Sequence, residues 1–237
     1  MFDPVLFVSL GPGDPELVTL KALKALQNAD VVFCPATRNK SGEFISRAAE
    51  ILSSLDINPD KIYRFDVPML PHRAAAQEAY RKAASEIITL HQAHQKIAVA
   101  AEGDAGFYST IDYISDDLAV AGIPLSRIAG VSAFIACGAL AGISITRQND
   151  ALEVIPGTVS FPELKEKLSM GKTLVVMKAS RCEEVLKQAL TMLDDTDFHY
   201  FENAGVSGRE FYTCRKEEIS VRTFPYFSLF IIQKKPI

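Results

Sequence analysis

The chain is poor in cysteine and has no excess of basic residues, and both deficits limit what it can do. Its 237 residues include four cysteines, with no CxxC pair and no Cys/His cluster at metal-ligand spacing: Cys34, Cys137, Cys182 and Cys214. We therefore predict reduced, buried thiols and no metal site. The formal net charge of -4 argues against a general nucleic-acid binder, because neutralising phosphates requires a basic face. A local basic cleft remains compatible with this charge.

Long apolar segments are also scarce. The first residues lack a basic stretch followed by an apolar one, which predicts no export signal and a cytoplasmic location. The 19 uncharged residues from 128 to 146 approach the length of a membrane-spanning helix. Small residues interrupt this segment at Gly130, Ser132, Gly138 and Gly142. The segment is therefore better interpreted as a strand end, a turn and a buried small-residue helix.

The residues that are present are typical of an ordinary globular α/β protein, with a hydrophobic fraction of 48% and a charged fraction of 23%. In the first half, short β-rich runs alternate with helical patterns, which predicts a parallel sheet with crossover helices. The expected strands are 5–10, 31–34, 62–65 and 97–101. The expected helices are 17–26, 44–55, 74–91 and 108–121.

The second half predicts a lobe with a mixed sheet. The expected strands are 152–155, 173–177, 198–202, 211–214 and 227–233, and the short spacing of the last three favours antiparallel pairing. Ser160, followed by Pro162 and Glu163, indicates the start of a helix. Turn residues at 122–126 mark the boundary. We predict an N-terminal α/β lobe over 1–122 and a C-terminal α/β lobe over 123–237.

Two glycine-rich turns carry the first candidate functional residues. The turn at 11–16 joins a strand to a helix that Asp14 can cap and Pro15 can begin. Glu16 stands where a dinucleotide fingerprint has its third glycine, and no Lys-Ser/Thr of a P-loop follows. The turn at 103–106 also follows a strand. Both turns should lie at one edge of a parallel sheet, where α/β folds bind ligands.

The polar and aromatic residues of these turns each allow two interpretations. Asp104 could contact a cationic ligand group or act as a base, or it could cap the following helix. Tyr108 could contact a ligand or pack in the core. A third glycine-to-helix transition, at 130–132, has a weaker signal, because capping is the default role of Ser132.

Taken together, the three segments resemble the tetrapyrrole (corrin/porphyrin) methylases. The pattern of that family includes a Gly-Pro-Gly-Asp-Pro turn, a Gly-Asp turn and a Gly-Val-Ser segment, and the resemblance covers nearly the whole chain. Within the family, residues 11–17, 107–110 and 226–232 look most like the branch that methylates carbon 20 of precorrin-2 or cobalt-factor II.

The resemblance implies a two-lobed fold with S-adenosylmethionine as the cofactor in the cleft between the lobes, a tetrapyrrole substrate in cobalamin biosynthesis, and a homodimer. By position, it implies cofactor contacts from Pro12, Gly103, Asp104, Phe107, Ser132, Ala133, Met177 and Ala204. This chain has Ala105 and Ala129 where the family generally has proline. Because proline fixes φ, we expect both turns to be less rigid here.

The implied reaction needs little beyond positioning. A sulfonium methyl group is already activated, so the protein has to hold the meso carbon in line with it and exclude water, without a metal or a covalent nucleophile. The meso carbon then has to lose a hydrogen. We predict Asp104 as the base for this step and Tyr108 as an orienting contact.

A polycarboxylate substrate requires basic side chains at the site. Three arginines follow apolar elements, in loop positions: Arg38, Arg147 and Arg181. Because a guanidinium group binds carboxylates in a two-pronged way, we predict these three as substrate contacts. The alternative for each is an ordinary solvated surface charge.

Two rival functions remain open at this level. One is another methylase of the same fold, acting at a different corrin position, on a modified histidine or on RNA, although the acidic net charge disfavours RNA. The other is a non-catalytic binding protein that kept the fold, because fold alone does not determine function.

Overall fold

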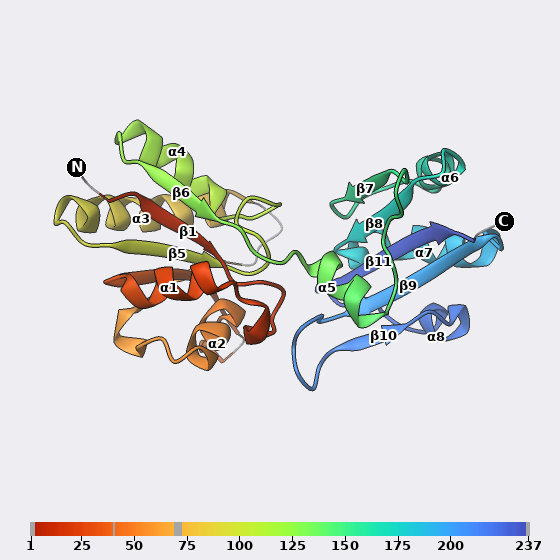
Figure 1. Cartoon of the computed structure of the whole chain (residues 1–237), viewed down its shortest axis with the longest axis horizontal. Coiled ribbons are helices and arrows are strands. Elements are labelled where there is room, and N and C mark those ends of the chain that lie inside the picture. Colours follow the sequence, from red (N-terminus) through yellow and green to blue (C-terminus); the bar gives the residue numbers. More distant parts are fainter. Residues whose placement is uncertain (1–2, 40, 69–72, 236–237) are drawn as a thin grey trace. The chain divides into compact units, whose positions relative to one another are not determined.

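The chain folds into two compact units that divide between Ser132 and Ala133. The computed structural model describes residues 3–39, 41–68 and 73–235, and each unit has its own sheet and core (Figure 1). The boundary that we predicted after residue 122 lies ahead of strand β6 (Leu125–Ile128), which pairs with strand β1 (Val5–Ser9) in the first sheet. Gly122, with a φ of 69°, therefore ends a helix within the first unit rather than a lobe.

The first sheet is parallel, as predicted, apart from one short strand. Its order is β3-β2-β5-β1-β6, and β4 also pairs with β2. The remaining strands are β2 (Val31–Arg38), β3 (Phe44–Ile45), β4 (Ile62–Asp66) and β5 (Ile97–Ala101). Only β3 is antiparallel to its neighbour among these described strands. Because β1 lies between β5 and β6, the carboxyl ends of these three strands are neighbours.

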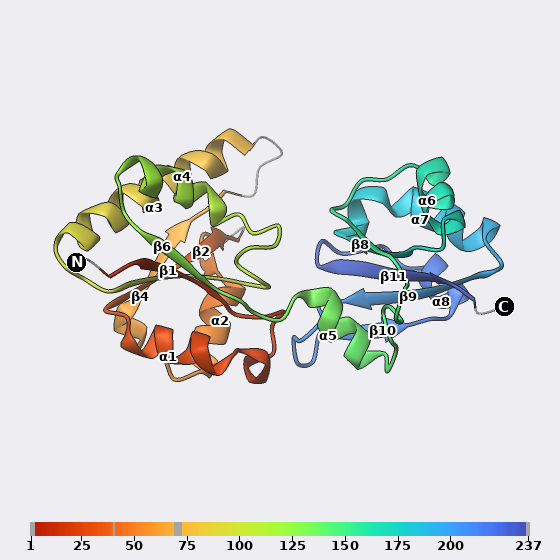
Figure 2. The same ribbon diagram turned by 45° about the horizontal axis from the view of Figure 1, so that its top comes forward.

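Helices cover both faces of this sheet. Helices α1 (Leu20–Asn28) and α2 (Arg47–Ser54) lie on one face, and α3 (Arg73–Gln92) and α4 (Asp112–Val120) lie on the other (Figure 2). Two short 3-10 helices are η1 (Pro15–Leu17) and η2 (Pro59–Lys61). Phe7 and Val8 are consecutive yet belong to different hydrophobic clusters, because successive side chains of a strand point to opposite faces. The apolar run in β1 thus contributes to two cores.

Three of the predicted helix starts lie too early. The helix expected from residue 44 begins at Arg47, because Ser46 caps it by accepting a hydrogen bond from the backbone N–H of Ala49 (3.1 Å), and residues 44–45 form β3 instead. The helix expected from residue 17 begins at Leu20 after its cap Thr19. The helix expected from residue 108 begins at Asp112.

The second unit has the predicted mixed sheet. Its order is β10-β9-β11-β8-β7, in which β7 and β8 are parallel and the other pairs are antiparallel. The strands are β7 (Leu152–Ile155), β8 (Thr173–Met177), β9 (Thr196–Glu202), β10 (Phe211–Thr213) and β11 (Ser228–Lys234). One face packs against α6 (Phe161–Ser169), α7 (Glu183–Met192) and α8 (Lys216–Ser220). Helix α6 starts with the predicted capping box of Ser160 and Glu163.

The uncharged segment 128–146 forms a strand end, a turn and the helix α5 (Ala133–Leu140), as predicted, but the helix is only partly buried, because Ile135 and Leu140 are exposed. A Cβ on Gly138 would lie 2.7 Å from Cγ1 of Ile145, so the chain turns back closely over this helix and requires a small residue there. In the part of the chain that the structure describes, every helix is too short or too polar to cross a membrane.

The cysteines give a first prediction. Cys34, Cys137 and Cys182 are buried as expected, but Cys214 is exposed, because it follows the edge strand β10. Burial raises the pKa of the Cys34 and Cys182 thiols to about 11, and it raises the pKa of Cys137 as well.

We expect a thiol reagent at pH 8 to modify only the exposed Cys214 rapidly in the native protein, and all four cysteines after denaturation. Rapid modification of a native Cys214→Ser variant would contradict this.

Candidate functional site

Two of the predicted functional turns lie side by side at the carboxyl edge of the first sheet. The backbone N–H of Gly11 donates to the carbonyl of Gly103 (3.1 Å), and the N–H of Gly103 donates to the carbonyl of Gly11 (2.6 Å). Both glycines have φ near 70°, a left-handed conformation that other residues rarely adopt. The prediction that both turns lie at one edge of the sheet is therefore confirmed, and the structure adds that they contact each other.

Asp104 ties the second turn to the third. Its Oδ1 accepts a hydrogen bond from the N–H of Gly106 (2.8 Å), and its Oδ2 accepts one from the N–H of Gly130 (2.8 Å). The following helix α4 has Ile111 at its N-cap position, without a side-chain cap. The capping alternative for Asp104 is therefore wrong. The carboxylate instead binds the backbone of its own turn and that of Gly130, which lies 26 residues further along the sequence.

Buried Ser9 completes this connection from the end of β1. Its hydroxyl donates to the carbonyl of Ile128 (2.6 Å) and accepts from the N–H of Ala105 (2.8 Å). A proline at position 105 could not donate this hydrogen bond. Ala105 therefore supplies a restraint on the second turn that replaces the fixed φ of the family's proline. Ala129 is exposed.

Gly130 allows the third turn to approach the second turn and the end of β1. A Cβ at this position would lie 2.4 Å from the Cβ of Ser9 and 3.2 Å from the carbonyl oxygen of Gly103. A side chain there would force the turns apart. The sequence marks Gly130 as the start of the third glycine-to-helix transition but predicts no contact for it, and it gives Ser9 no role, because local motifs do not show contacts over such a sequence distance.

The aromatic pair after the second turn has an unusual backbone. Tyr108 has a φ of 52°, which is strained for an aromatic residue, and its side chain is 51% exposed. The rings of Phe107 and Tyr108 meet edge to face, with centroids 4.7 Å apart. The Phe107 N–H donates to the carbonyl of Asp104 (3.1 Å). The core interpretation of Tyr108 is therefore wrong, and its ring lies at the surface beside the turn.

Two predicted cofactor residues of the second unit, Met177 and Ala204, lie at the carboxyl ends of strands in its sheet. Met177 ends β8, and Ala204 follows the end of β9. Strands β8 and β9 both pair antiparallel with β11 and therefore run in the same direction. The two remaining predicted cofactor residues, Ser132 and Ala133, flank the boundary between the units, and Ala133 begins α5.

Two acidic residues shape the loop that contains Ala204. Glu202 accepts hydrogen bonds from the Tyr200 hydroxyl (2.8 Å) and from Nε of Arg222 (2.6 Å) at the end of β9. Glu210 accepts one from the N–H of Gly205 (2.6 Å). These ties hold both ends of the 203–210 loop. The sequence alone does not assign roles to Glu202 and Glu210, because one partner of Glu202 is Arg222, which lies in the loop after α8.

The three predicted substrate arginines have different surroundings. The Arg38 guanidinium contacts Oδ2 of Asp66 (2.7 Å) and the carbonyl of Gly42 (2.9 Å), and it lies 4.1 Å from the ring centroid of Phe44. It therefore already holds the connection between β2 and β3. Arg147 lies in an exposed loop after α5.

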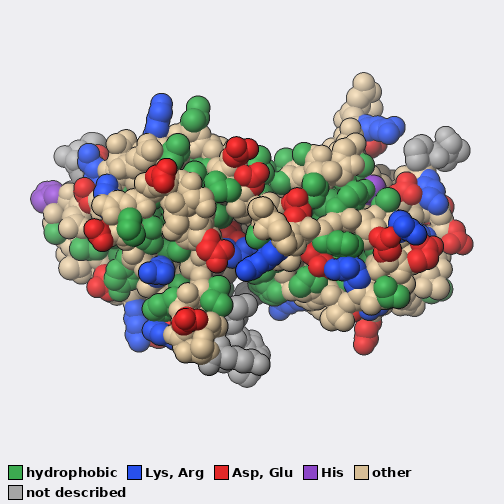
Figure 3. All heavy atoms as spheres, turned by 90° about the horizontal axis from the view of Figure 1, so that it is seen from below, with side chains coloured by type: hydrophobic (Ala, Val, Ile, Leu, Met, Phe, Trp, Pro, Cys, Tyr) green, Lys and Arg blue, Asp and Glu red, His purple; other side chains and the backbone are tan. Residues whose placement is uncertain are grey.

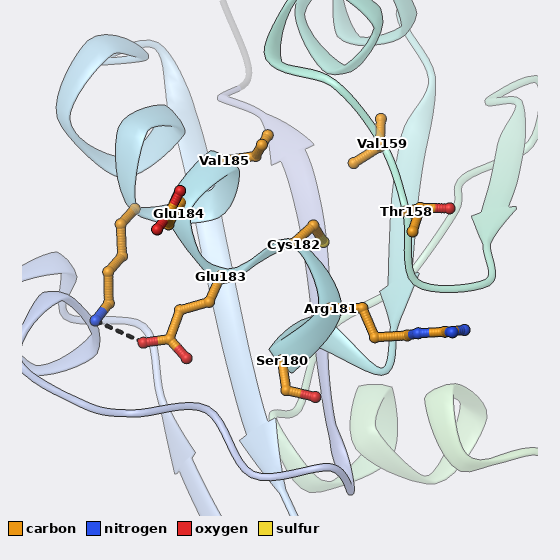
Figure 4. Close-up of a pocket in the computed structure, with 9 residues that line it drawn as sticks. Thr158, Val159, Ser180, Arg181, Cys182, Glu183, Glu184 and Val185 are labelled. Carbon is orange, nitrogen blue, oxygen red and sulfur yellow. Dashed lines mark ion pairs between the residues drawn. The ribbon is translucent and has the colours of Figure 1, made fainter. Parts of the chain in front are cut away.

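Arg181 lines a cavity of about 660 Å³ at the carboxyl ends of β7 and β8. Its side chain extends on the side of Thr158, away from Glu183 (Figure 4). A Cβ on Gly157 would lie 3.0 Å from Cδ of Arg181, so the glycine leaves room for the arginine stem. On the face seen in Figure 3, acidic and basic side chains are interspersed with hydrophobic ones.

Comparison with known proteins shows which protein family this chain is similar to. The model of the Tetrapyrrole (Corrin/Porphyrin) Methylases matches residues 4–220. A precorrin-2 C(20)-methyltransferase from Sinorhizobium sp is 30% identical, over 95% of this chain and 93% of that protein. A cobalt-precorrin-2 C(20)-methyltransferase from Salmonella typhimurium is 26% identical, over 96% and 95%. The structure of a Thermus thermophilus uroporphyrin-III C-methyl transferase complexed with S-adenyl homocysteine has a TM-score of 0.67 at 21% identity, covering 98% of this chain and 97% of that one.

The hydrogen bonds of Asp104 predict its effect on stability. Asp104→Ala removes two charge-assisted hydrogen bonds to backbone N–H groups and should lower the free energy of unfolding by about 2 kcal/mol in urea denaturation. The exposed Asp116, on α4, provides a control: Asp116→Ala should leave the urea midpoint almost unchanged. Equal midpoints for the two variants would show that Asp104 does not hold the turns.

A pair of proline substitutions tests the restraint at Ala105. Ala105→Pro removes the hydrogen bond to buried Ser9 and should cost about 1 kcal/mol of stability, measured in the same way. Ala129→Pro places the family's residue at an exposed position and should have little effect. A stabilising Ala105→Pro substitution would contradict the role given to the Ser9 hydroxyl.

Proposed function

Because the chain belongs to the tetrapyrrole (corrin/porphyrin) methylases, we propose that it transfers a methyl group from S-adenosylmethionine to meso carbon 20 of precorrin-2 or cobalt-factor II in cobalamin biosynthesis. The observation that carries this proposal is the meeting of the glycine-rich turns at the carboxyl edge of β1 and β5, where α/β folds bind ligands. The position of methylation is supported by relatives named for carbon 20, which match along nearly their whole length.

The turns have the properties that an adenosylmethionine site requires. A Cβ on Gly103 would meet no atom within 4 Å, so the backbone of the second turn borders open space that a ligand could enter. Pro12, Asp104 and Phe107 lie on the same two turns or directly after them. The contacts expected from further along the chain come from Ser132, Ala133, Met177 and Ala204. When bound, S-adenosylmethionine would supply an already activated methyl group.

The chain's own residues would mainly provide preorganisation. Ser9 and Asp104 fix the second and third turns, and the Gly11–Gly103 pair fixes the first turn against the second, so the backbone groups at the site need little rearrangement on binding. Asp104 remains our predicted base for the hydrogen on carbon 20. Each of its oxygens accepts one backbone hydrogen bond, and Oδ2 also lies 3.5 Å from the Ser9 hydroxyl, so Oδ1 is the oxygen that keeps a second lone pair for a proton. Tyr108, half exposed beside this turn, is our predicted orienting contact.

The substrate arginines can now be ranked by their contacts. Arg38 already uses its guanidinium group within the first unit, so binding a substrate carboxylate there would require it to exchange partners. Arg147 and Arg181 are exposed like Arg38, but within the described residues their guanidinium groups make no ion pair, so they fit the role better. Arg181 is our first choice, because it combines a guanidinium group with a cavity. A homodimer in the cytoplasm is the proposed setting.

A methylation assay with precorrin-2 and cobalt-factor II side by side tests the function. We expect S-adenosylmethionine to be consumed with at least one of them, the product mass to increase by one CH2 unit because a methyl group replaces a hydrogen, and the new methyl group to be on carbon 20. Methylation at another carbon would favour a different corrin methylase. If calorimetry detected no binding of S-adenosylmethionine or its demethylated product, the non-catalytic binding protein would be the better interpretation.

A further inference from the structure

Arg47 occupies a position that is unfavourable for a cation. It is the first residue of α2, where the helix dipole presents its positive end, and its side chain is only 15% exposed. Arginine is rarely buried without a partner, and local helix electrostatics do not favour it here. Contacts outside the helix must therefore account for its placement.

Those contacts join the two turns that form the Gly11–Gly103 pair. Arg47 Nε lies 2.8 Å from Oε1 of Glu102, and Nη2 donates a hydrogen bond to the carbonyl of Pro12 (3.3 Å). Pro12 directly follows Gly11, and Glu102 directly precedes Gly103. One guanidinium group thus links both turns from the side of α2.

The geometry favours arginine over lysine. The rigid, forked guanidinium group presents separate N–H donors to a carboxylate and to a backbone carbonyl, whereas an ammonium group on a flexible stem is less well preorganised for both. Burial raises the pKa of Glu102, and the positive charge of Arg47 opposes that effect. Each charge is therefore partly shielded from water and depends on the other for its stabilisation.

We propose that Arg47, paired with Glu102, is a positioning residue for the S-adenosylmethionine site. It fixes the Pro12 carbonyl and the start of the second turn, so the turns keep one arrangement before the ligand binds. This inference rests on the proposed function, because it takes the ligand of the turns from there. It adds a determinant of ligand affinity that lies outside all three turns and belongs to none of the sequence motifs.

The test compares ligand affinity with stability in the same variants. Calorimetry with S-adenosylhomocysteine gives the dissociation constant, and thermal denaturation gives the melting temperature. Arg47→Met keeps a stem of similar shape but removes the donors, and it should weaken binding roughly tenfold, about 1.4 kcal/mol. Glu102→Gln should weaken it by a similar factor, and Arg47→Lys by less. The double variant should be no weaker than the worse single variant, because both changes break one contact.

A control separates positioning from general destabilisation. Ile51→Val shortens a buried side chain of the same helix and keeps both Arg47 contacts, so it should lower the melting temperature but leave the affinity unchanged. If Arg47→Met and Glu102→Gln bind S-adenosylhomocysteine as tightly as the unmodified chain, Arg47 only anchors α2 and the inference is wrong. Should Arg47→Met fail to fold, Arg47→Lys and Glu102→Gln decide the question by the same criterion. If the unmodified chain binds no S-adenosylhomocysteine, the proposed function itself fails.

Discussion

The candidate site depends on the hydrogen bonds that Ser9 and Asp104 make to backbone groups of neighbouring turns. Three parallel strands end at one edge of a sheet, and nothing in strand pairing alone determines how the chain continues beyond them. The Ser9 hydroxyl and the Asp104 carboxylate bind N–H and C=O groups of the second and third turns, which would otherwise need water or a ligand. Partly buried hydrogen bonds of this kind select one arrangement, because an unpaired polar group there would be costly.

Much of the fold could be predicted because its signals are local. The runs at 97–101, 152–155 and 173–177 are strands with the predicted bounds, since short apolar β-rich segments between turns have few alternatives. Helix starts were less accurate where apolar spacing continued past the cap. The residues at 44–45 continue the helical pattern of α2, but the side chain of Ser46 begins the helix only after them. Local periodicity predicts that a helix exists, and the capping residue determines where it begins.

The contacts of the site could not be predicted in the same way, because they join positions far apart in the sequence. Ser9 and Ile128 are separated by 119 positions, and Arg47 and Pro12 by 35. The Gly-Asp motif identified Asp104 as a candidate functional residue of the second turn, but it did not show which N–H groups the carboxylate binds. The domain boundary has a similar explanation. A turn at Gly122 is visible in the sequence, but whether the next strand pairs with β1 or starts a new sheet depends on the tertiary fold.

Ala105 shows why a departure from a family pattern has to be judged in its structure. Proline restrains a turn by fixing φ, and its loss alone implies a looser turn. Alanine, unlike proline, has a backbone N–H group. At position 105 this N–H donates a hydrogen bond of 2.8 Å to the hydroxyl of Ser9 at the end of β1. A hydrogen bond to Ser9 thereby replaces the fixed φ of a proline. This bond couples the second turn to β1, and the bond from Ser9 to the Ile128 carbonyl extends the coupling to β6. The shape of this turn therefore depends on the Ser9 hydroxyl, to which any residue except proline at position 105 can donate its backbone N–H.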